Sequence, residues 1–153
     1  PQRGSVDLRD ALGATVAALM PDPAGRSGLL VALGPAVSGP RYQVDLATAR
    51  AVAASLTTRG PSAPGEELAP LKDAGAVVDD PEADRVRLDI REAARLQLIE
   101  AGVQRSNIHS CPLCTVSEPQ LFHSWRRDQI KAVQWSGIVS QSPEFAKNEA
   151  FGT

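Results

Sequence analysis

The chain has 153 residues, a length that suits one domain and leaves no room for two of ordinary size. Hydrophobic residues make up 42% of it and charged residues 22%, which excludes a long disordered chain and a collagen-like composition. Sixteen Lys and Arg against eighteen Asp and Glu give a net charge of -2. We therefore expect no nucleic-acid partner, because the chain has no basic surplus to attract one.

The sequence shows no targeting or membrane segment. No stretch approaches the roughly 18 apolar residues of a membrane span, and no basic segment followed by an apolar run marks a signal peptide. The two cysteines, Cys111 and Cys114, are too few for a disulfide framework and suit a reducing compartment. We expect an intracellular protein, in the cytoplasm or in an organelle such as a plastid. The chain begins at Pro1 rather than Met, so we also expect an upstream segment to have been removed.

The first half of the chain predicts two helices and two strands. In chain order these are a core-facing helix over residues 8–20, a buried strand over 29–33, a tight structural turn over 34–40, a strand over 42–44 and a helix over 46–56. Ser5 or Asp7 is placed to cap the first helix, and Pro21 stops it. Asp45 is placed to cap the second.

The second half predicts shorter elements. They are a loop over 59–70, an extended piece over 77–78, a strand over 86–88, a helix over 90–101 and extended pieces over 107–111, 122–127 and 133–139. Asp89 and Glu92 form a capping-box-like start for the helix, and Gly102 is placed to end it with positive φ. Helices alternating with short strands predict an α/β domain with a mixed sheet over residues 1–141, followed by a polar, flexible tail over 142–153.

Four possible soft-metal ligands lie within fifteen residues, namely His109, Cys111, Cys114 and His123. Zinc takes four nitrogen or sulfur ligands, and the Cys-x-x-Cys half-site can supply two thiolates from one tight turn. The spacing is not that of a standard zinc finger, so two idle thiols with two structural histidines are the simpler interpretation. A thioredoxin-like redox role is less well supported than a zinc site, because Cys111 and Cys114 do not lie at the start of a helix after a clear βαβ strand.

The basic pair Arg126-Arg127, preceded by Trp125 and followed by Asp128, is a second candidate. The planar guanidinium suits phosphate or carboxylate, and the indole can stack on a base or cover the guanidinium. On a strand the two arginines would face opposite sides, so one would enter a pocket while the other pairs with Asp128 or faces solvent. A simple exposed ion pair is the alternative.

Three segments together resemble a known family. They are Ala32–Val37 followed by Tyr42–Val44, then Leu88–Ile90 leading into Ala94–Leu98 and Ala101–Val103, and then Asn107-Ile108 through Leu113-Cys114-Thr115 to Leu121–Asp128. Their order and spacing resemble the laccase-domain family, also called multicopper polyphenol oxidoreductases, whose members are understood mainly as purine nucleoside phosphorylases. The resemblance extends from the first helix to about Val139.

The resemblance implies a mixed α/β layered fold and phosphorolysis of adenosine, inosine or guanosine, with phosphate as co-substrate. It also implies a catalytic metal, usually zinc, held by two His and one Cys in an earlier segment that has no counterpart here. The resemblance therefore covers only the later part of the domain, and it makes none of the His and Cys residues of this chain a metal ligand.

Three positions of this chain match the family's motifs, and the resemblance makes them candidates for substrate binding. Cys114 is expected near the pocket wall, and Arg126 or Arg127 is expected to anchor phosphate or substrate. After Asp128 the sequence departs from the Gly/Thr-Gly-Arg pattern of the family, so no contact is carried over from that turn.

Two functions remain open. One is a purine nucleoside phosphorylase whose ligand-bearing segment lies outside this chain, in which case this chain alone is expected to be inactive and its catalytic residues are unassigned. The alternative is a non-catalytic structural or interaction subunit of a larger assembly, with a protein partner covering an exposed sheet edge and apolar faces. A small zinc module built on Cys111 and Cys114 is a third, weaker hypothesis.

Overall fold

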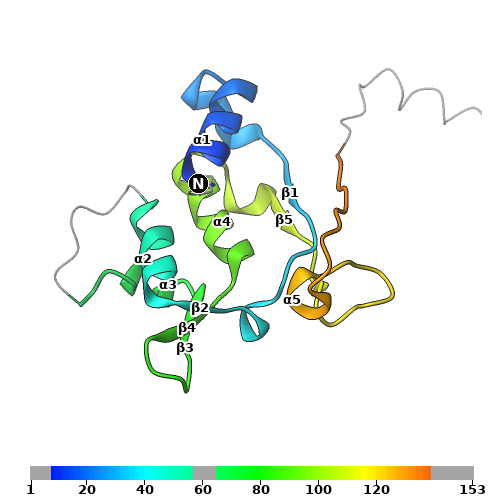
Figure 1. Ribbon diagram of the computed structural model, residues 1–153. Coiled ribbons are helices and arrows are strands. Elements are labelled where there is room, and N and C mark those ends of the chain that lie inside the picture. Colours follow the sequence, from blue (N-terminus) through cyan, green and yellow to red (C-terminus); the bar gives the residue numbers. More distant parts are fainter. Residues whose placement is uncertain (1–7, 57–64, 139–153) are drawn as a thin grey trace, which may run out of the picture.

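The computed structural model describes residues 8–56 and 65–138, with the side chains of the first helix from Leu12 onward (Figure 1). The elements are α1 (Leu8–Leu19), η1 (Pro23–Gly28), β1 (Val31–Leu33), η2 (Gly39–Arg41), β2 (Gln43–Asp45), α2 (Leu46–Ala54), α3 (Ala69–Asp73), β3 (Val77–Asp79), β4 (Arg85–Leu88), α4 (Ile90–Glu100), η3 (Arg105–Asn107), β5 (Ile108–Ser110) and α5 (Trp125–Asp128). The predicted caps Ser5 and Asp7 and the predicted tail 142–153 lie outside the described residues.

The strands form two small sheets. β2, β4 and β3 make an antiparallel sheet in that order, with Val44 opposite Val86. β1 and β5 pair in parallel, and an isolated parallel bridge between Ala36 and Cys114 extends their pairing toward the carboxyl ends of both strands. Parallel and antiparallel pairs occur together, so the predicted α/β class with mixed strand directions is confirmed.

Helix α4 belongs to both hydrophobic cores and ties the two sheets together. Its first turn contributes Ala93 to a core of apolar side chains from α2, α3 and the three-stranded sheet, where Leu71 and Leu88 are at most 1% exposed. Its last turn contributes Leu98 to a second core with Val16 of α1 and Ile108 of β5. Figure 1 shows α4 between α1 and the three-stranded sheet.

Local capping explains where the helices begin and end. Asp45 accepts a hydrogen bond from Thr48 N at 2.6 Å, and Asp89 accepts from Arg91 N at 3.0 Å and Glu92 N at 3.4 Å, so both predicted caps are confirmed. The reciprocal half of the capping box is not used, because the Glu92 carboxylate pairs with Arg95 Nη1 at 3.0 Å.

The end of α4 also follows its prediction. Gly102 has a φ of 101°, a left-handed conformation that glycine adopts without steric cost. Its N–H donates to Ile99 O, and Val103 N donates to Leu98 O, so the last carbonyls of the helix are satisfied within the turn.

Several predicted elements are wrong. The segment predicted as extended over 122–127 contains the helical turn α5, and residues 133–138 belong to no strand. The predicted loop 59–70 runs into α3, which sequence periodicity missed because the helix is five residues long and Pro70 occupies its first turn. The strand predicted as buried over 29–33 is half-exposed, because only one of its faces is covered. Leu29, Val31 and Leu33 pack against the second core, whereas the alternate side chains are exposed, with Leu30 at 69%.

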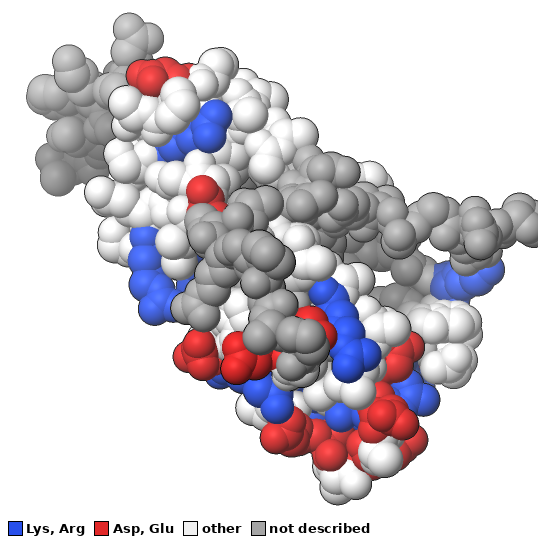
Figure 2. All heavy atoms as spheres, turned by 90° about the vertical axis from the view of Figure 1, so that its left-hand side faces the viewer, with Lys and Arg blue, Asp and Glu red and all other residues white. Residues whose placement is uncertain are grey.

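The charged surface carries both signs. Figure 2 shows acidic and basic side chains interspersed at the lower end of the face in view, where the three-stranded sheet lies. Ion pairs there include Lys72 with Asp79 at 2.6 Å and Arg87 with Asp80 at 2.7 Å. Among the described residues, no helix is both long enough and apolar enough to cross a membrane.

We predict that Leu88→Ala lowers the free energy of unfolding by about 2–5 kcal/mol, because it leaves a cavity in the core that joins α4 to the sheet. Val78→Ala on the neighbouring strand is the matched control, since Val78 is 52% exposed and its truncation should change stability by less than about 0.5 kcal/mol. Urea unfolding followed by circular dichroism measures both. Equal losses in the two variants would contradict the core assignment.

Candidate functional site

The loop after β5 carries most of the predicted site residues, and arginines of α4 hold its beginning. Arg91 Nη1 donates to the carbonyl oxygens of Cys111 at 2.5 Å and Leu113 at 3.2 Å. Arg95 Nη2 donates to Ser110 Oγ at 2.7 Å. Because α4 contributes side chains to both cores, these contacts tie β5 and the start of the loop to a helix that packs against both parts of the fold.

Arg127 holds the rest of the loop. Its Nη1 donates to Thr115 O at 2.7 Å and Val116 O at 3.3 Å, and its Nη2 donates to Phe122 O at 2.9 Å. Its Nε and Nη2 also bind both carboxylate oxygens of Asp128 at 2.7 Å. These hydrogen bonds from Arg127 lower the pKa of Asp128. Every nitrogen of the guanidinium is therefore engaged inside the protein, so Arg127 acts as a structural clamp.

Arg126 differs from its neighbour. It is exposed, and its guanidinium carbon lies 4.2 Å from the centroid of the Tyr42 ring, within cation–π distance. The strand assumed for this pair is wrong, since successive residues on the helical turn α5 diverge by about 100° rather than facing opposite sides. The geometry presents the guanidinium of Arg126 at the surface, oriented by the aromatic ring of Tyr42.

Cys114 is buried against the loop that follows β1. Ser38 donates to its sulfur from both N and Oγ, each at 3.3 Å. Burial raises the pKa of the Cys114 thiol, but hydrogen bonds from Ser38 and Ser117 outweigh this effect and lower the pKa from 9.0 to about 6. Residues 34–40 were predicted from the sequence to be a structural turn only. The role of Ser38 was therefore missed, because it contacts Cys114 across a separation of 76 residues.

The four possible metal ligands are not brought together. Cys114 faces Ser38, and His123 Nδ1 lies 3.8 Å from Asp128 Oδ2, while His109 and Cys111 line a pocket at the carboxyl ends of β1 and β5. Within residues 8–56 and 65–138, no group of three or more His, Cys, Asp or Glu side chains is arranged to hold a metal ion. The described donors therefore do not fit the zinc implied by the family resemblance.

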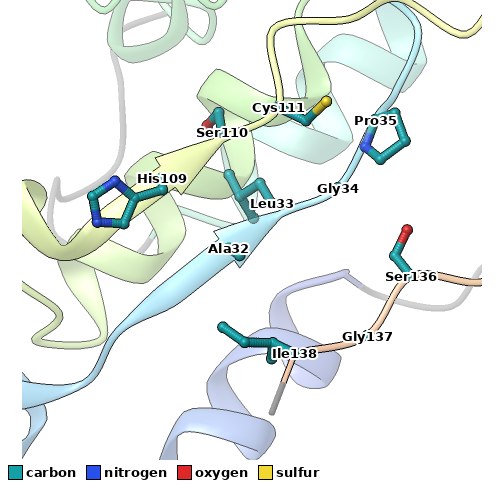
Figure 3. Close-up of a pocket in the computed structure, with 10 residues that line it drawn as sticks. All are labelled: Ala32, Leu33, Gly34, Pro35, His109, Ser110, Cys111, Ser136, Gly137 and Ile138. Atoms are coloured by element: carbon teal, nitrogen blue, oxygen red, sulfur yellow. The ribbon is translucent and has the colours of Figure 1, made fainter. Parts of the chain in front are cut away.

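A pocket of about 430 Å³ opens at the carboxyl ends of β1 and β5 (Figure 3). Its lining includes Ala32, Gly34, His109, Cys111, Ser136 and Ile138. Figure 3 shows Ala32 and Ile138 on opposite sides of the opening, with the His109 ring and the Cys111 sulfur pointing in different directions. The carboxyl ends of parallel strands are where open α/β sheets bind ligands, and the pocket lies at this position. Arg126, Arg127 and Cys114 are not among its lining residues.

Separate substitutions of the two arginines test their different roles. We predict that Arg127→Gln lowers the free energy of unfolding by about 2–3 kcal/mol, because several carbonyl oxygens and Asp128 lose a charged donor. Arg126→Gln should cost less than about 1 kcal/mol, the scale of an exposed cation–π contact. Denaturant unfolding measures both, and similar losses would contradict the clamp.

The ionisation of Cys114 gives a second test. In a Cys111→Ser background, thiolate absorbance near 240 nm should rise with a midpoint near pH 6, and Ser38→Ala should move the midpoint upward. Because the folded pKa lies below that of an unfolded thiol, the unfolded chain binds more protons between pH 6 and 9, so stability should increase with pH across this window. Cys114→Ser should remove this increase. A midpoint above pH 8 would show that the serine hydrogen bonds do not stabilise a thiolate.

Comparison with known proteins identifies relatives. A purine nucleoside phosphorylase of Synechocystis is 41% identical over 116 residues, which cover 73% of this chain and 44% of the relative. Purine nucleoside phosphorylase YlmD of Geobacillus stearothermophilus is 36% identical over 119 residues, which cover 78% of this chain and 38% of the relative. YlmD of Bacillus subtilis is 35% identical over 113 residues. This chain spans about two-fifths of the length of these curated relatives.

Solved structures and a family model identify the same group of proteins as the sequence relatives. The crystal structure of Geobacillus stearothermophilus YlmD has a TM-score of 0.60 and 29% identity, and the match covers 77% of this chain and 39% of that one. The YfiH structure of Bacillus licheniformis has a TM-score of 0.56 at 23% identity, with the same coverage, and so shows the fold. A family model described as multi-copper polyphenol oxidoreductase laccase matches residues 2–140. This chain therefore belongs to the multi-copper polyphenol oxidoreductase laccase family.

Proposed function

We propose that this chain forms the later part of a purine nucleoside phosphorylase that uses phosphate to cleave adenosine, inosine or guanosine. The observation that carries the proposal is the 35–41% identity to three curated purine nucleoside phosphorylases. This chain spans about two-fifths of those proteins, so the activity requires groups that the described residues do not supply. Catalytic residues are accordingly left unassigned, and this chain alone is expected to be inactive.

In this proposal the loop after β5 binds substrate rather than breaking the glycosidic bond. Arg126 anchors phosphate or the substrate, because its planar guanidinium is exposed and held in one orientation by the Tyr42 ring. Arg127 positions Arg126 by clamping the loop, and its own donors are already engaged. Cys114 lies at the base of the same loop, where Ser38 fixes the loop to the end of β1.

The test is phosphorolysis by the protein in its native form. Intact mass first gives the length of the native polypeptide, and that form is then incubated with inosine, adenosine or guanosine and inorganic phosphate. The expected result is phosphate-dependent release of the base and ribose 1-phosphate from a native chain longer than 153 residues. A native polypeptide of this length that turns over none of the three nucleosides would contradict the proposal.

We predict that Arg126→Gln raises the KM for phosphate by about tenfold in the native enzyme, the loss expected for one charged hydrogen-bonding partner. Arg126→Lys should recover part of the effect, because it restores the charge without the planar fork. Arg50→Gln on α2 is the matched control, since Arg50 is an exposed arginine in a different part of the fold. Unchanged phosphate dependence in Arg126→Gln would exclude this residue as the anchor.

A second candidate is a non-catalytic interaction subunit. It is favoured by several large apolar side chains that the described residues leave exposed, among them Trp135 at 92% and Val133 at 81%. In that case the native protein would lack phosphorolysis and would purify with a partner in fixed stoichiometry. Turnover by a native preparation free of other polypeptides would exclude this candidate.

A further inference from the structure

The Asp89 carboxylate holds two segments at once. Its Oδ1 accepts hydrogen bonds from Arg91 N and Glu92 N and so caps α4. Its Oδ2 accepts from Gly39 N at 3.4 Å, across 50 residues of sequence. Gly39 is buried, and a Cβ atom on it would lie 3.1 Å from Asp89 Cβ and 3.4 Å from Asp89 N. The absence of a side chain at Gly39 therefore lets the loop before β2 sit directly on the start of α4.

Gly39 begins η2, a single 3₁₀ turn that links two residues of this loop that contact the candidate site. The backbone hydrogen bonds of the turn, at 2.9 and 3.0 Å, run to the carbonyl oxygens of Ser38 and Gly39. Ser38 occupies the N-cap position of η2, but its side chain does not cap the turn, because the hydroxyl donates to Cys114 Sγ instead. At the other end of the turn, the ring of Tyr42 lies against the guanidinium of Arg126.

The first turn of α4 also binds the second loop of the candidate site. Arg91 Nη1 donates to the carbonyl oxygens of Cys111 and Leu113 in the loop after β5. Arg91 Nε lies 3.6 Å from Asp89 Oδ1, so the side chains that hold the two loops are themselves an ion pair. The two loops are therefore joined to each other through one turn of one helix.

Strand β4 supports η2 at its other end. Leu88 N donates to Tyr42 O at 3.0 Å, and Arg87 Nη1 donates to Pro40 O. Asp89 binds the beginning of the turn instead, next to the residue that contacts the thiol. Loss of the Asp89 contact should therefore displace the beginning of the turn more than its end.

We infer that Asp89 is a positioning residue for the candidate site, because it sets how the loop over residues 38–42 meets the loop after β5. The contacts that depend on it are those of Ser38 with Cys114 and of Tyr42 with Arg126. Its effect on catalysis rests on the proposed function, in which Arg126 anchors phosphate. Its effect on the loops does not.

Asp89→Asn separates capping from positioning. The amide oxygen still accepts from Arg91 N and keeps the cap, whereas the amide NH₂ faces Gly39 N–H, donor against donor. We expect the titration midpoint of the Cys114 thiol to rise from about 6 by at least about half a pH unit, because Ser38 moves away from the sulfur. Loss of a negative charge would by itself lower this midpoint, so a rise reports the position of Ser38.

The measurement is thiolate absorbance in the native form of the protein, taken as the difference between each variant and the same variant carrying Cys114→Ser. Asp45→Asn is the matched control, because Asp45 caps α2 through Thr48 N, and it should leave the midpoint unchanged. Gly39→Ala keeps the carboxylate but displaces the turn, so it should also raise the midpoint. Gly28→Ala should not, since a Cβ atom there meets nothing within 4 Å. The two glycine variants test the inference even if Asp89→Asn does not fold.

Phosphate dependence gives the second readout. Asp89→Asn should raise the KM for phosphate about threefold, the scale of a lost exposed cation–π contact, with kcat unchanged. The inference is overturned if Asp89→Asn and Gly39→Ala both fold and leave the midpoint unchanged or lowered. A wild-type midpoint above about pH 8 also overturns it, since Ser38 is then not held against a thiolate. An unchanged KM beside a raised midpoint would remove Arg126 from the contacts that Asp89 positions. Absence of phosphorolysis in the wild type contradicts the proposed function alone, because the titration needs no turnover.

Discussion

Three arginine side chains determine the shape of the loop on which the candidate site depends. Arg91 and Arg95 reach it from α4, and Arg127 reaches back from α5 to Thr115, Val116 and Phe122. A loop of this length has many carbonyl oxygens that no helix or sheet satisfies, and unpaired buried carbonyls are costly. Charged donors with several N–H groups satisfy them from few positions, and the loop is thereby held in one conformation.

This clamp connects the two ends of the molecule. Helix α4 packs against the three-stranded sheet through Ala93 and against α1 and β5 through Leu98, so the arginines it carries are anchored in both cores. The clamped loop then brings Cys114 to Ser38 and places Arg126 over Tyr42, which lies at the start of the three-stranded sheet. Residues that are far apart in sequence meet because one helix and one loop cross the whole fold.

The two adjacent arginines show how the fold divides roles between chemically identical side chains. Arg127 uses its fork inside the protein, whereas Arg126 presents its guanidinium on the surface. The same contrast separates the cysteines: Cys114 is a buried thiol surrounded by serine donors, and Cys111 lines an open pocket. In both pairs the position in the fold, rather than the chemistry of the side chain, decides which member is engaged inside the protein.

The sequence by itself determined the elements that depend on local chemistry. Asp45 and Asp89 cap their helices and Gly102 ends α4, because capping and positive φ involve only residues a few positions apart. Three segments between Ala32 and Asp128, taken in their order and spacing, were enough to indicate the family, which the match over residues 2–140 shows. Only the tertiary structure decided that Arg126 and Arg127 lie on a helical turn, that Ser38 lowers the pKa of Cys114, and that the four soft ligands stay apart. The pairing of Ser38 with Cys114 and the separation of the soft ligands depend on contacts between segments far apart in the sequence. The helical turn of Arg126 and Arg127 accompanies the binding of loop carbonyl oxygens by Arg127. Contacts of these kinds leave no periodic pattern in the sequence.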